Sequence, residues 1–453
     1  LETGFGDVYC VKQNRRNNKV RRRDDMDGVE INVIDFGAKG DGTSYDAQAI
    51  QAAIDYAANR GGKVVVPPGV YLCGTIRLKS NVELHLREGA ILKASERIED
   101  YNSEDEYIQN FSSAKEEWRG LHLLLCVEQH DVTLSGKGVI DGSGDAFFGE
   151  PTTYGSPYIW KNGLALAKDK EKLRPGQTVC FIECQNVKIE GVSVRNATCW
   201  AFFLHGCDRA NVRGVSVHNP PYYANTDGID IDSCSSVDVS GCVIDTGDDA
   251  IAIRGASRRL KNKDKKCEHI TVSDCVLASS SSVIRIGIGQ SEIRHIRISD
   301  IVIKRGGIGL NVLSAAYGRN HTPINDVRCR NIEMQNTSRP FMITANEDST
   351  ISDFVIENFR SETESGALIC SESKTAIFDV RLSNVELIEK TFSFSSQNAE
   401  DREAALLQCK GIDGLQLQSV CIRSAAEKNS EMRQTIEIRD CTRVVSNTRE
   451  KNS

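Results

Sequence analysis

Two short motifs near the middle of the 453-residue chain combine carboxylates with small, turn-forming residues. The first is Asn225-Thr-Asp-Gly228 and the second is Gly247-Asp-Asp249. Their acidic residues are Asp227, Asp248 and Asp249. When carboxyl groups crowd together, repulsion raises at least one pKa, so one acid can donate a proton while another accepts one. Such a pair is what glycoside hydrolysis requires.

A repeat that follows Leu72 gives the separation between Asp227 and Asp248 a structural meaning. Short β-branched segments recur between turn residues, and four of them begin with a cysteine, at positions 184, 207, 234 and 267. A period in the twenties or low thirties, as between these cysteines, is typical of solenoids. The alternation of apolar and polar residues predicts strands, and the absence of helical connections favours a parallel β-helix. Weaker copies of the segment begin near Ile293, Ile324, Ile351, Ile377 and Ile412.

Stacked coils of such a fold lie about 4.8 Å apart. The distance along the chain from Asp227 to Asp248 matches about one coil, so we expect these two acids at the same angular position on neighbouring coils, with Asp249 beside them. The in-phase cysteines should stack inside as small hydrophobic residues, and disulfides are the alternative. The remaining acids of this region are interpreted as turn residues: Asp230, Asp232, Asp238 and Asp245.

The rest of the chain predicts one structural domain, at residues 29–441. Residues 1–28 are polar and predict a flexible basic tail, and residues 442–453 predict a disordered tail. Residues 46–59 carry apolar side chains at helical spacing, and this helix should cap the first coil. Long loops are expected to interrupt the coils at 96–120, 143–178 and 255–267.

Composition excludes several classes of protein. The net charge of −7 gives no global basic excess, so nucleic acid is not expected as a partner. No apolar run of about 18 residues is present, so no membrane-spanning helix is expected. The 16 cysteines form no paired Cys-x-x-Cys motifs, so zinc is not expected. We expect no metal and no cofactor, and the sequence says nothing about oligomeric state.

At its acidic motifs the chain resembles glycoside hydrolase family 28, the polygalacturonase and rhamnogalacturonase group. The resemblance runs from about residue 30 to 390 and includes Phe36-Gly-Ala-Lys-Gly-Asp-Gly42. It implies an all-β, single-stranded, right-handed parallel β-helix and inverting hydrolysis of a pectic backbone. It also implies that Asp248 is the general acid and that Asp227 and Asp249 hold and activate the attacking water. An extracellular or periplasmic location is the corresponding expectation.

The chain departs from the polygalacturonase pattern around these acids. Ser281 or Ser282 stands where the family has the histidine of a Gly-His-Gly motif, and Asn311-Val-Leu313 stands where it has Arg-Ile-Lys. The position nearest to the family's tyrosine is about Glu347. These departures argue against polygalacturonase in the strict sense, but they leave hydrolysis of a pectin-like or other acidic glycan as the expectation.

Other residues could contact such a glycan. Arg254 and Arg285 lie close enough in the repeat to pair with a sugar carboxylate or sulfate. The candidates for substrate binding are Asn225, Arg254, Arg285, His205, Ser281 and Asn311. His205 could equally be a packed core histidine, and the basic insertion at 257–266 could equally be a solvated loop. Trp200, Tyr222 and Tyr223 could stack on sugar rings, although Trp200 could also belong to the core.

Two further functions remain open on the sequence alone. In a β-helix polysaccharide lyase, the acids would bind calcium and Arg254 or Arg285 would abstract a proton. A glycan-binding β-helix that has lost activity would explain the missing histidine, arginine and lysine. The intact acid trio favours the hydrolase.

Overall fold

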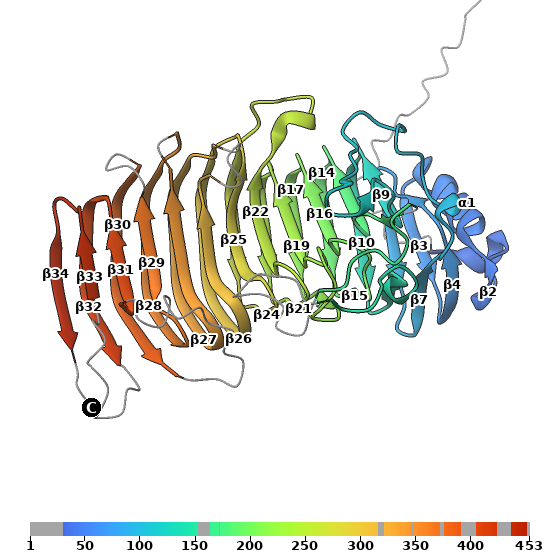
Figure 1. Cartoon of the computed structure of the whole chain (residues 1–453). Helices are drawn as coiled ribbons and strands as arrows, with labels where there is room; N and C mark the ends of the chain where they lie inside the picture. Colours follow the sequence, from blue (N-terminus) through green and yellow to red (C-terminus); the bar gives the residue numbers. More distant parts are fainter. Residues whose placement is uncertain are drawn as a thin grey trace, which may run out of the picture.

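The computed structural model shows a stack of β-strand coils along one axis, with the N-terminal coils at one end and the C-terminal coils at the other (Figure 1). It describes residues 30–152, 164–171, 173–315, 321–346, 348–371, 376–390, 405–423 and 436–450. Successive coils pair in parallel, and their strands form three rows that run along the stack. This arrangement is a parallel β-helix, as the repeat predicted. The predicted basic tail at 1–28 and Glu347 lie outside the described residues.

The first row contains the longest strands: β1 (Glu30–Asn32), β3 (Gly62–Val66), β6 (Val82–Leu86), β10 (His130–Gly136), β14 (Gln185–Glu190), β17 (Asp208–Arg213), β20 (Ser235–Ser240), β23 (Cys267–Ser273), β26 (Ile293–Leu313), β27 (Ile324–Ala345), β28 (Ile351–Thr363), β30 (Ile377–Glu389), β32 (Ile412–Arg423) and β34 (Val445–Glu450). The second row contains shorter strands: β2 (Asp41–Tyr45), β4 (Gly69–Cys73), β7 (Ala90–Ala94), β11 (Val139–Asp141), β15 (Ser193–Arg195), β18 (Ser216–His218), β21 (Val243–Thr246) and β24 (Val276–Ser279). The third row contains β5 (Ile76–Arg77), β9 (Leu124–Val127), β13 (Val179–Ile182), β16 (Phe202–His205), β19 (Ile229–Asp232), β22 (Ile251–Gly255), β25 (Ser282–Gly289), β29 (Ala367–Ser371), β31 (Leu407–Lys410) and β33 (Ile436–Arg439). From β26 onward one continuous strand can run through more than one row, because β26 pairs with β23, β24 and β25 in turn.

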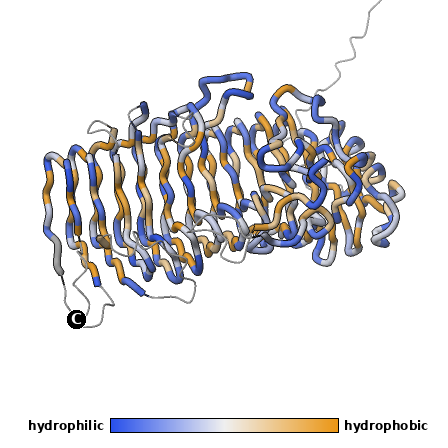
Figure 2. The backbone as a smooth tube through the Cα atoms, in the orientation of Figure 1, coloured by the Kyte–Doolittle hydropathy of each residue, from blue (hydrophilic) through white to orange (hydrophobic). Residues whose placement is uncertain are grey.

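The interior of the coils is built by the alternation that the sequence displays, and Figure 2 shows hydrophobic and hydrophilic residues alternating along the strands. In β14, for example, Val187 and Ile189 are buried, whereas Lys188 and Glu190 are exposed. The predicted column of in-phase residues is present. It begins with fully buried cysteines whose thiols are free, and it continues through the predicted weaker copies: Cys184, Cys207, Cys234, Cys267, Ile293, Ile324, Ile351, Ile377 and Ile412. Among the described cysteines, the packing interpretation therefore holds rather than the disulfide one.

The predicted helix is α1 (Ala47–Ala58), and it covers the N-terminal end of the stack (Figure 1). Its buried face carries Ile50, Ala53, Ile54 and Ala57, which join the same core as the coils. An uncapped first coil would leave the apolar interior open to water, so this packing gives the helix its role as a cap. Within the described part of the chain, four short 3-10 helices lie in the connections: η2 (Val33–Phe36), η3 (Ile98–Asp100), η4 (Gly144–Ala146) and η5 (Ser257–Arg259).

The C-terminal end differs from the prediction of a disordered tail from residue 442. Val445–Glu450 form β34, which pairs in parallel with β32 and extends the first row by one strand. The backbone of Thr442 also pairs with Asp413. The polar composition of this segment concealed the strand, because an edge strand gains backbone hydrogen bonds without burying many side chains. Among the described residues, no helix is long and apolar enough to span a bilayer.

The described parts of two predicted long loops fold back onto the outer face of the third row. The loop at 101–123 carries β8 (Trp118–Arg119), which pairs with β12 (Arg174–Pro175) from the loop at 143–178. Together they bury an apolar cluster outside the coils: Trp118, Leu125, Cys180, Ile182, Cys199, Trp200 and Phe203. In the N-terminal half of the stack, the third-row strands are therefore buried on both faces. Without these loops, the outward-facing side chains of the strands would be exposed to solvent.

Candidate active site

The two acidic motifs lie at the starts of neighbouring strands in the third row. Ile229 of β19 is paired with Ile251 of β22, and the amide of Gly228 donates to the carbonyl of Asp249 at 2.9 Å. One coil therefore leads from Asp227 to Asp249, and Asp249, rather than Asp248, lies directly beside Asp227. The expected alignment of Asp227 with Asp248 is wrong by one position. The predicted crowding is still present, because carboxylate oxygens of the three acids lie within 4.8 Å of one another.

The glycines of both motifs allow this close approach. A Cβ on Gly247 would lie 2.3 Å from the carbonyl oxygen of Tyr223, and one on Gly228 would lie 2.4 Å from the carbonyl oxygen of Ala250. Real Cβ atoms do not approach backbone oxygen so closely, so any larger residue would push the coils apart. Each glycine thereby fixes the position of the acid that adjoins it.

Asp249 is buried and receives three hydrogen-bond donors from the next coil. The hydroxyl of Ser281 and the amide of Ser282 both donate to Oδ1 at 3.2 Å, and Nε of Arg285 donates to Oδ2. Because every donor needs an acceptor oxygen, the ionised form of Asp249 fits these contacts. Ser281, expected to contact substrate, instead contacts an acid of the trio.

Arg285 lies within the acid cluster. Its Nη2 is 3.8 Å from Oδ2 of Asp227, and the residue is only 8% exposed. Burial alone would lower the pKa of Arg285, but the charges of Asp249 and Asp227 raise it above its usual value. Both contacts are with the protein's own carboxylates, so the expected role of Arg285 in substrate binding has no direct support in its geometry.

Asp248 is the one partly exposed acid of the trio. Burial and the neighbouring charge of Asp249 raise the pKa of Asp248 to about 7. Burial raises the pKa of Asp227 well above its ordinary value as well, and the adjacent acids add to the effect. At neutral pH the cluster therefore holds protons, and Asp248 can reach an external ligand with one of them.

Two further acids of β19 were misinterpreted as turn residues. Asp230 and Asp232 alternate with Ile229 and Ile231, so both point to the outer face of the strand, where they are buried. Arg254 of the next coil pairs with both, at 3.7 Å from Asp230 and 3.3 Å from Asp232. The alternation Ile-Asp-Ile-Asp is a strand pattern, and it was the signal that could have revealed these positions.

The side chains of Asn225 and Asn311, two further candidates, hydrogen-bond to other residues around the site. Asn225 adopts a left-handed conformation, with φ of 52°, and its side-chain oxygen accepts from the buried Arg174 at 2.7 Å. Asn311 donates to the hydroxyl of Ser282 at 2.9 Å. Arg174 was not predicted, because it lies in a long loop and reaches the site only after that loop folds back.

His205 and the aromatic candidates are mostly packed against protein. His205 is 2% exposed, donates to the carbonyl of Ala256 at 3.1 Å and stacks on Phe203, and burial lowers its pKa. Trp200 is buried, and the guanidinium of Arg254 lies 4.6 Å from its ring centroid. Tyr223 stacks on Phe148, whereas Tyr222 is 37% exposed. Of these candidates, Tyr222 presents the most surface to a ligand.

The cations of the insertion at 257–266 are largely engaged by neighbouring coils and loops. Arg259 donates to the carbonyl of Asn110, and Lys261 pairs with Glu128. Lys265 pairs with Asp208, and Lys266 with Glu292. These contacts anchor the insertion to the protein and support its interpretation as a structural loop.

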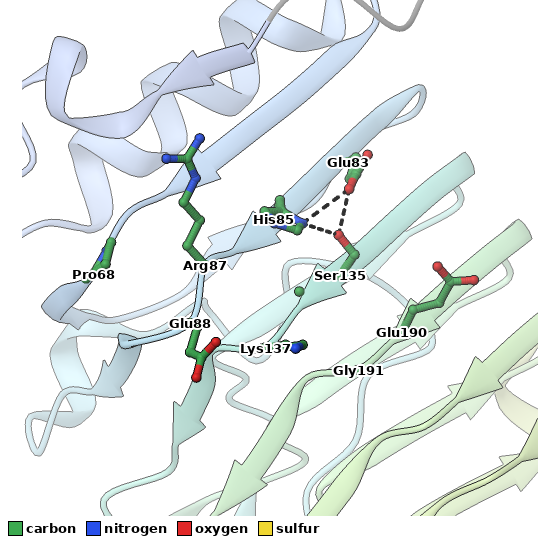
Figure 3. A pocket seen from close by; sticks show the side chains of 10 residues that line it. Pro68, Glu83, His85, Arg87, Glu88, Ser135, Lys137, Glu190 and Gly191 are labelled. Atoms are coloured by element: carbon green, nitrogen blue, oxygen red, sulfur yellow. Dashed lines mark hydrogen bonds and ion pairs between the residues drawn. The ribbon is translucent and has the colours of Figure 1, made fainter.

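A second polar cluster lies on the first row, away from the acid trio (Figure 3). Ser135 donates to Glu83 at 2.6 Å, and Nδ1 of His85 lies 2.7 Å from the same hydroxyl. The single hydroxyl proton goes to Glu83, so His85 donates to Ser135 and cannot serve as its base. The cluster therefore lacks the arrangement of a Ser-His nucleophile.

The sequence profile of "Glycosyl hydrolases family 28" matches residues 62–405. A probable polygalacturonase of Vitis vinifera is 25% identical over 335 residues, which is 70% of this chain and 63% of that protein. An exo-poly-alpha-D-galacturonosidase of Dickeya chrysanthemi is 26% identical over 388 residues, covering 74% of this chain and 63% of that protein. The matches thus span slightly less than two-thirds of these relatives.

Solved structures share the fold. The family 28 exopolygalacturonase of Yersinia enterocolitica aligns with a TM-score of 0.67 and 18% identity, over 90% of this chain and 78% of that one. The exopolygalacturonase of Thermotoga maritima aligns with a TM-score of 0.57 and 21% identity, over 88% of this chain and 87% of that one. These alignments confirm the fold class.

Proposed function

Since the chain belongs to the family 28 glycosyl hydrolases, we propose that it is an inverting glycosidase that cleaves a pectic polysaccharide or oligosaccharide. The observation that carries the proposal is the cluster of Asp227, Asp248 and Asp249, whose oxygens lie within 4.8 Å of one another. A partly exposed, protonated acid next to an ionised one supplies the acid and the base of glycoside hydrolysis.

In the proposed reaction Asp248 gives its proton to the glycosidic oxygen as the bond from that oxygen to the anomeric carbon breaks. A water molecule held by Asp227 and Asp249 attacks the anomeric carbon from the opposite side, and its proton passes to Asp249. The products are two sugars with free hydroxyl groups. Proton exchange with solvent then restores Asp248 and Asp249 to their starting states.

The distance between the acid and the base relates to whether a glycosidase inverts or retains the anomeric configuration. Inverting enzymes commonly separate the acid and base by about 6.5–9.5 Å, and retaining enzymes by about 5 Å. One carboxylate oxygen from each of the three acids lies within 4.8 Å of the other two. The centres of the carboxyl groups can be farther apart than these oxygens. Two oxygens at that separation can both hydrogen-bond one water, which supports the role of Asp227 and Asp249. NMR detection of the first anomer released tests inversion, and a retained configuration contradicts it.

The central test is Asp248→Asn, assayed for reducing-sugar release from defined pectic oligosaccharides. We expect a loss of about 100-fold or more, because the amide cannot donate the acid's proton. The wild-type rate should also fall as the pH rises through about 7, where Asp248 loses its proton. An active Asp248→Asn variant with unchanged circular dichroism contradicts the proposal.

The lyase alternative makes different predictions. It requires a basic arginine and a calcium-dependent uronate elimination, whereas Arg254 and Arg285 both contact acids of the protein. We expect no absorbance from an unsaturated product and no effect of a calcium chelator. Either signal, seen together with retained activity of Asp248→Asn, would support the lyase.

A further inference from the structure

Arg285 is the cation that lies inside the acid trio, and its surroundings define what it can bind. It projects from β25 on the outer face of the third row, because its strand neighbours Ile284 and Ile286 point into the core. Its register partner on the preceding coil is Ala252, whose small side chain leaves room for the guanidinium. The arginine can therefore extend back toward the acids at the starts of β19 and β22.

The contacts of the guanidinium go to the two acids that would hold the attacking water. Nε donates to Asp249, and Nη2 lies 3.8 Å from Asp227. The same Asp249 receives the Ser281 hydroxyl and the Ser282 amide from the coil of Arg285. Three donors from one coil thus fix the orientation of a carboxylate on the previous coil.

We propose that Arg285 is a positioning residue, which holds the carboxylates of Asp249 and Asp227 for the attacking water and does not grip a carboxylate of the substrate. The inference rests on the proposed glycosidase function. Nε and Nη2 face these two carboxylates, and although Nη1 has no hydrogen-bond partner among the described residues, Arg285 is buried and only 8% exposed. Recognition of substrate then falls to groups other than Arg285.

The charge balance around the trio supports this assignment. The charged groups that face it from the packed elements are Asp230 and Asp232 on β19, Arg254 on β22, and Arg174 and Glu116 from the two loops. Arg254 is engaged by Asp230 and Asp232. Arg174 donates to the carbonyls of Thr198 and Glu116 and to Asn225. Among the described residues, Arg285 is therefore the cation in direct contact with the trio, and its removal should raise the proton affinity of Asp227 and Asp248.

The first test is a pH titration of the aspartate carboxyl carbons by ¹³C NMR, without substrate. Asp227→Asn and Asp248→Asn assign the two signals. In Arg285→Gln we expect both titrations to move upward by about one pH unit or more, and Arg285→Lys should restore part of the shift because it keeps the charge. Arg294→Gln is the control, since Arg294 pairs with Glu268 on the first row. Unmoved titrations in Arg285→Gln overturn the proposal.

The second test is kinetic, with polygalacturonate as substrate. We expect Arg285→Gln to lower kcat about 100-fold with little change in KM, and to move both limbs of the pH–rate profile to higher pH. A raised KM with unchanged kcat and pH profile overturns the proposal and assigns Arg285 to substrate binding. If Arg285→Gln does not fold, the same two readouts on Arg285→Lys decide. If the wild type does not cleave polygalacturonate, the same kinetic comparison is made on the pectic oligosaccharide that it does cleave. Cleavage of none of them contradicts the proposed function, and the NMR titration still tests Arg285 independently.

Discussion

Asp230 is a buried acid on β19, close to the acid trio. It is fully buried, and neither of its oxygens has a hydrogen-bond partner among the described residues. Arg254, at 3.7 Å, is its nearest ion-pair partner. Burial raises the pKa of Asp230 to about 8, although Arg254 and Arg285 oppose the shift. At neutral pH Asp230 is therefore mostly protonated, which lowers the charge density that Asp227 meets.

This burial predicts a stability that depends on pH. The folded protein binds the proton of Asp230 up to about pH 8, whereas the unfolded chain releases it near pH 3.8. The free energy of unfolding should therefore fall as the pH rises between these values, by a few kcal/mol for this group, on the order of 2–5. Chemical denaturation from pH 5 to 9 measures it. Asp230→Asn should flatten the dependence, and parallel curves for variant and wild type would contradict the assignment.

At the scale of single residues, the sequence predicted the acid trio but not the residues that contact it. Asp227, Asp248 and Asp249 stand in two recognisable motifs, and their crowding follows from any coil that brings the second motif back beside the first. Asp230 was missed because aspartate is common in turns, and Arg174 because its loop has no periodic pattern. Arg285 was identified as a functional candidate, but its contacts depend on the register between coils, which composition does not determine.

The loops that cover the third row decide which part of that face a polymer can use. Trp118 and Trp200 lie in one apolar cluster, and Arg259 of the basic insertion reaches across to Asn110. Tyr223 also packs with Phe148 and Leu164 of the loop at 143–178. The N-terminal approach to the trio is thus covered by protein, while Asn311 and the later coils continue the face in the opposite direction.

Because the loops cover the N-terminal approach to the acid trio, we expect the protein to cleave polysaccharides near a chain end. On polygalacturonate, short products should appear from the start of the reaction while the viscosity of the solution falls slowly, because a polymer cannot lie across the covered strands. Size-exclusion chromatography with viscometry measures both. A rapid drop in viscosity at low reducing-sugar release would show internal cleavage and contradict the prediction.

The coils themselves were predictable because a single column of interior residues repeats. The change from cysteine to isoleucine between Cys267 and Ile293 weakens the sequence signal but preserves the column. The strand β34 was not predictable, because its mostly polar sequence lacks the apolar alternation, although its partner β32 is one coil back like those of other strands. Local patterns thus identified interior strands, whereas an edge strand depended on tertiary pairing.

On the scale of the whole molecule, the stack is capped at its N-terminal end by a helix. Helix α1 buries Ile54 against the first coils, and Ala52 on the same helix is exposed. We expect Ile54→Ala to lower the free energy of unfolding by about 2–4 kcal/mol through a cavity in the cap. Ala52→Gln is the matched control and should change it by less than about 0.5 kcal/mol. Urea unfolding followed by circular dichroism measures both, and equal effects would contradict the capping role.

The free thiols of the interior column also give the molecule a set of natural position markers. Cys184, Cys207, Cys234 and Cys267 of this column are fully buried on successive coils, and two further buried cysteines outside the column, Cys126 and Cys409, lie on an earlier coil and near the C-terminal end. In a solenoid, neighbouring coils stabilise one another and unfolding can begin locally. A thiol reagent can reach each cysteine only when its own coil opens. Mass spectrometry of timed alkylation would therefore record the order in which the coils separate, without any introduced label.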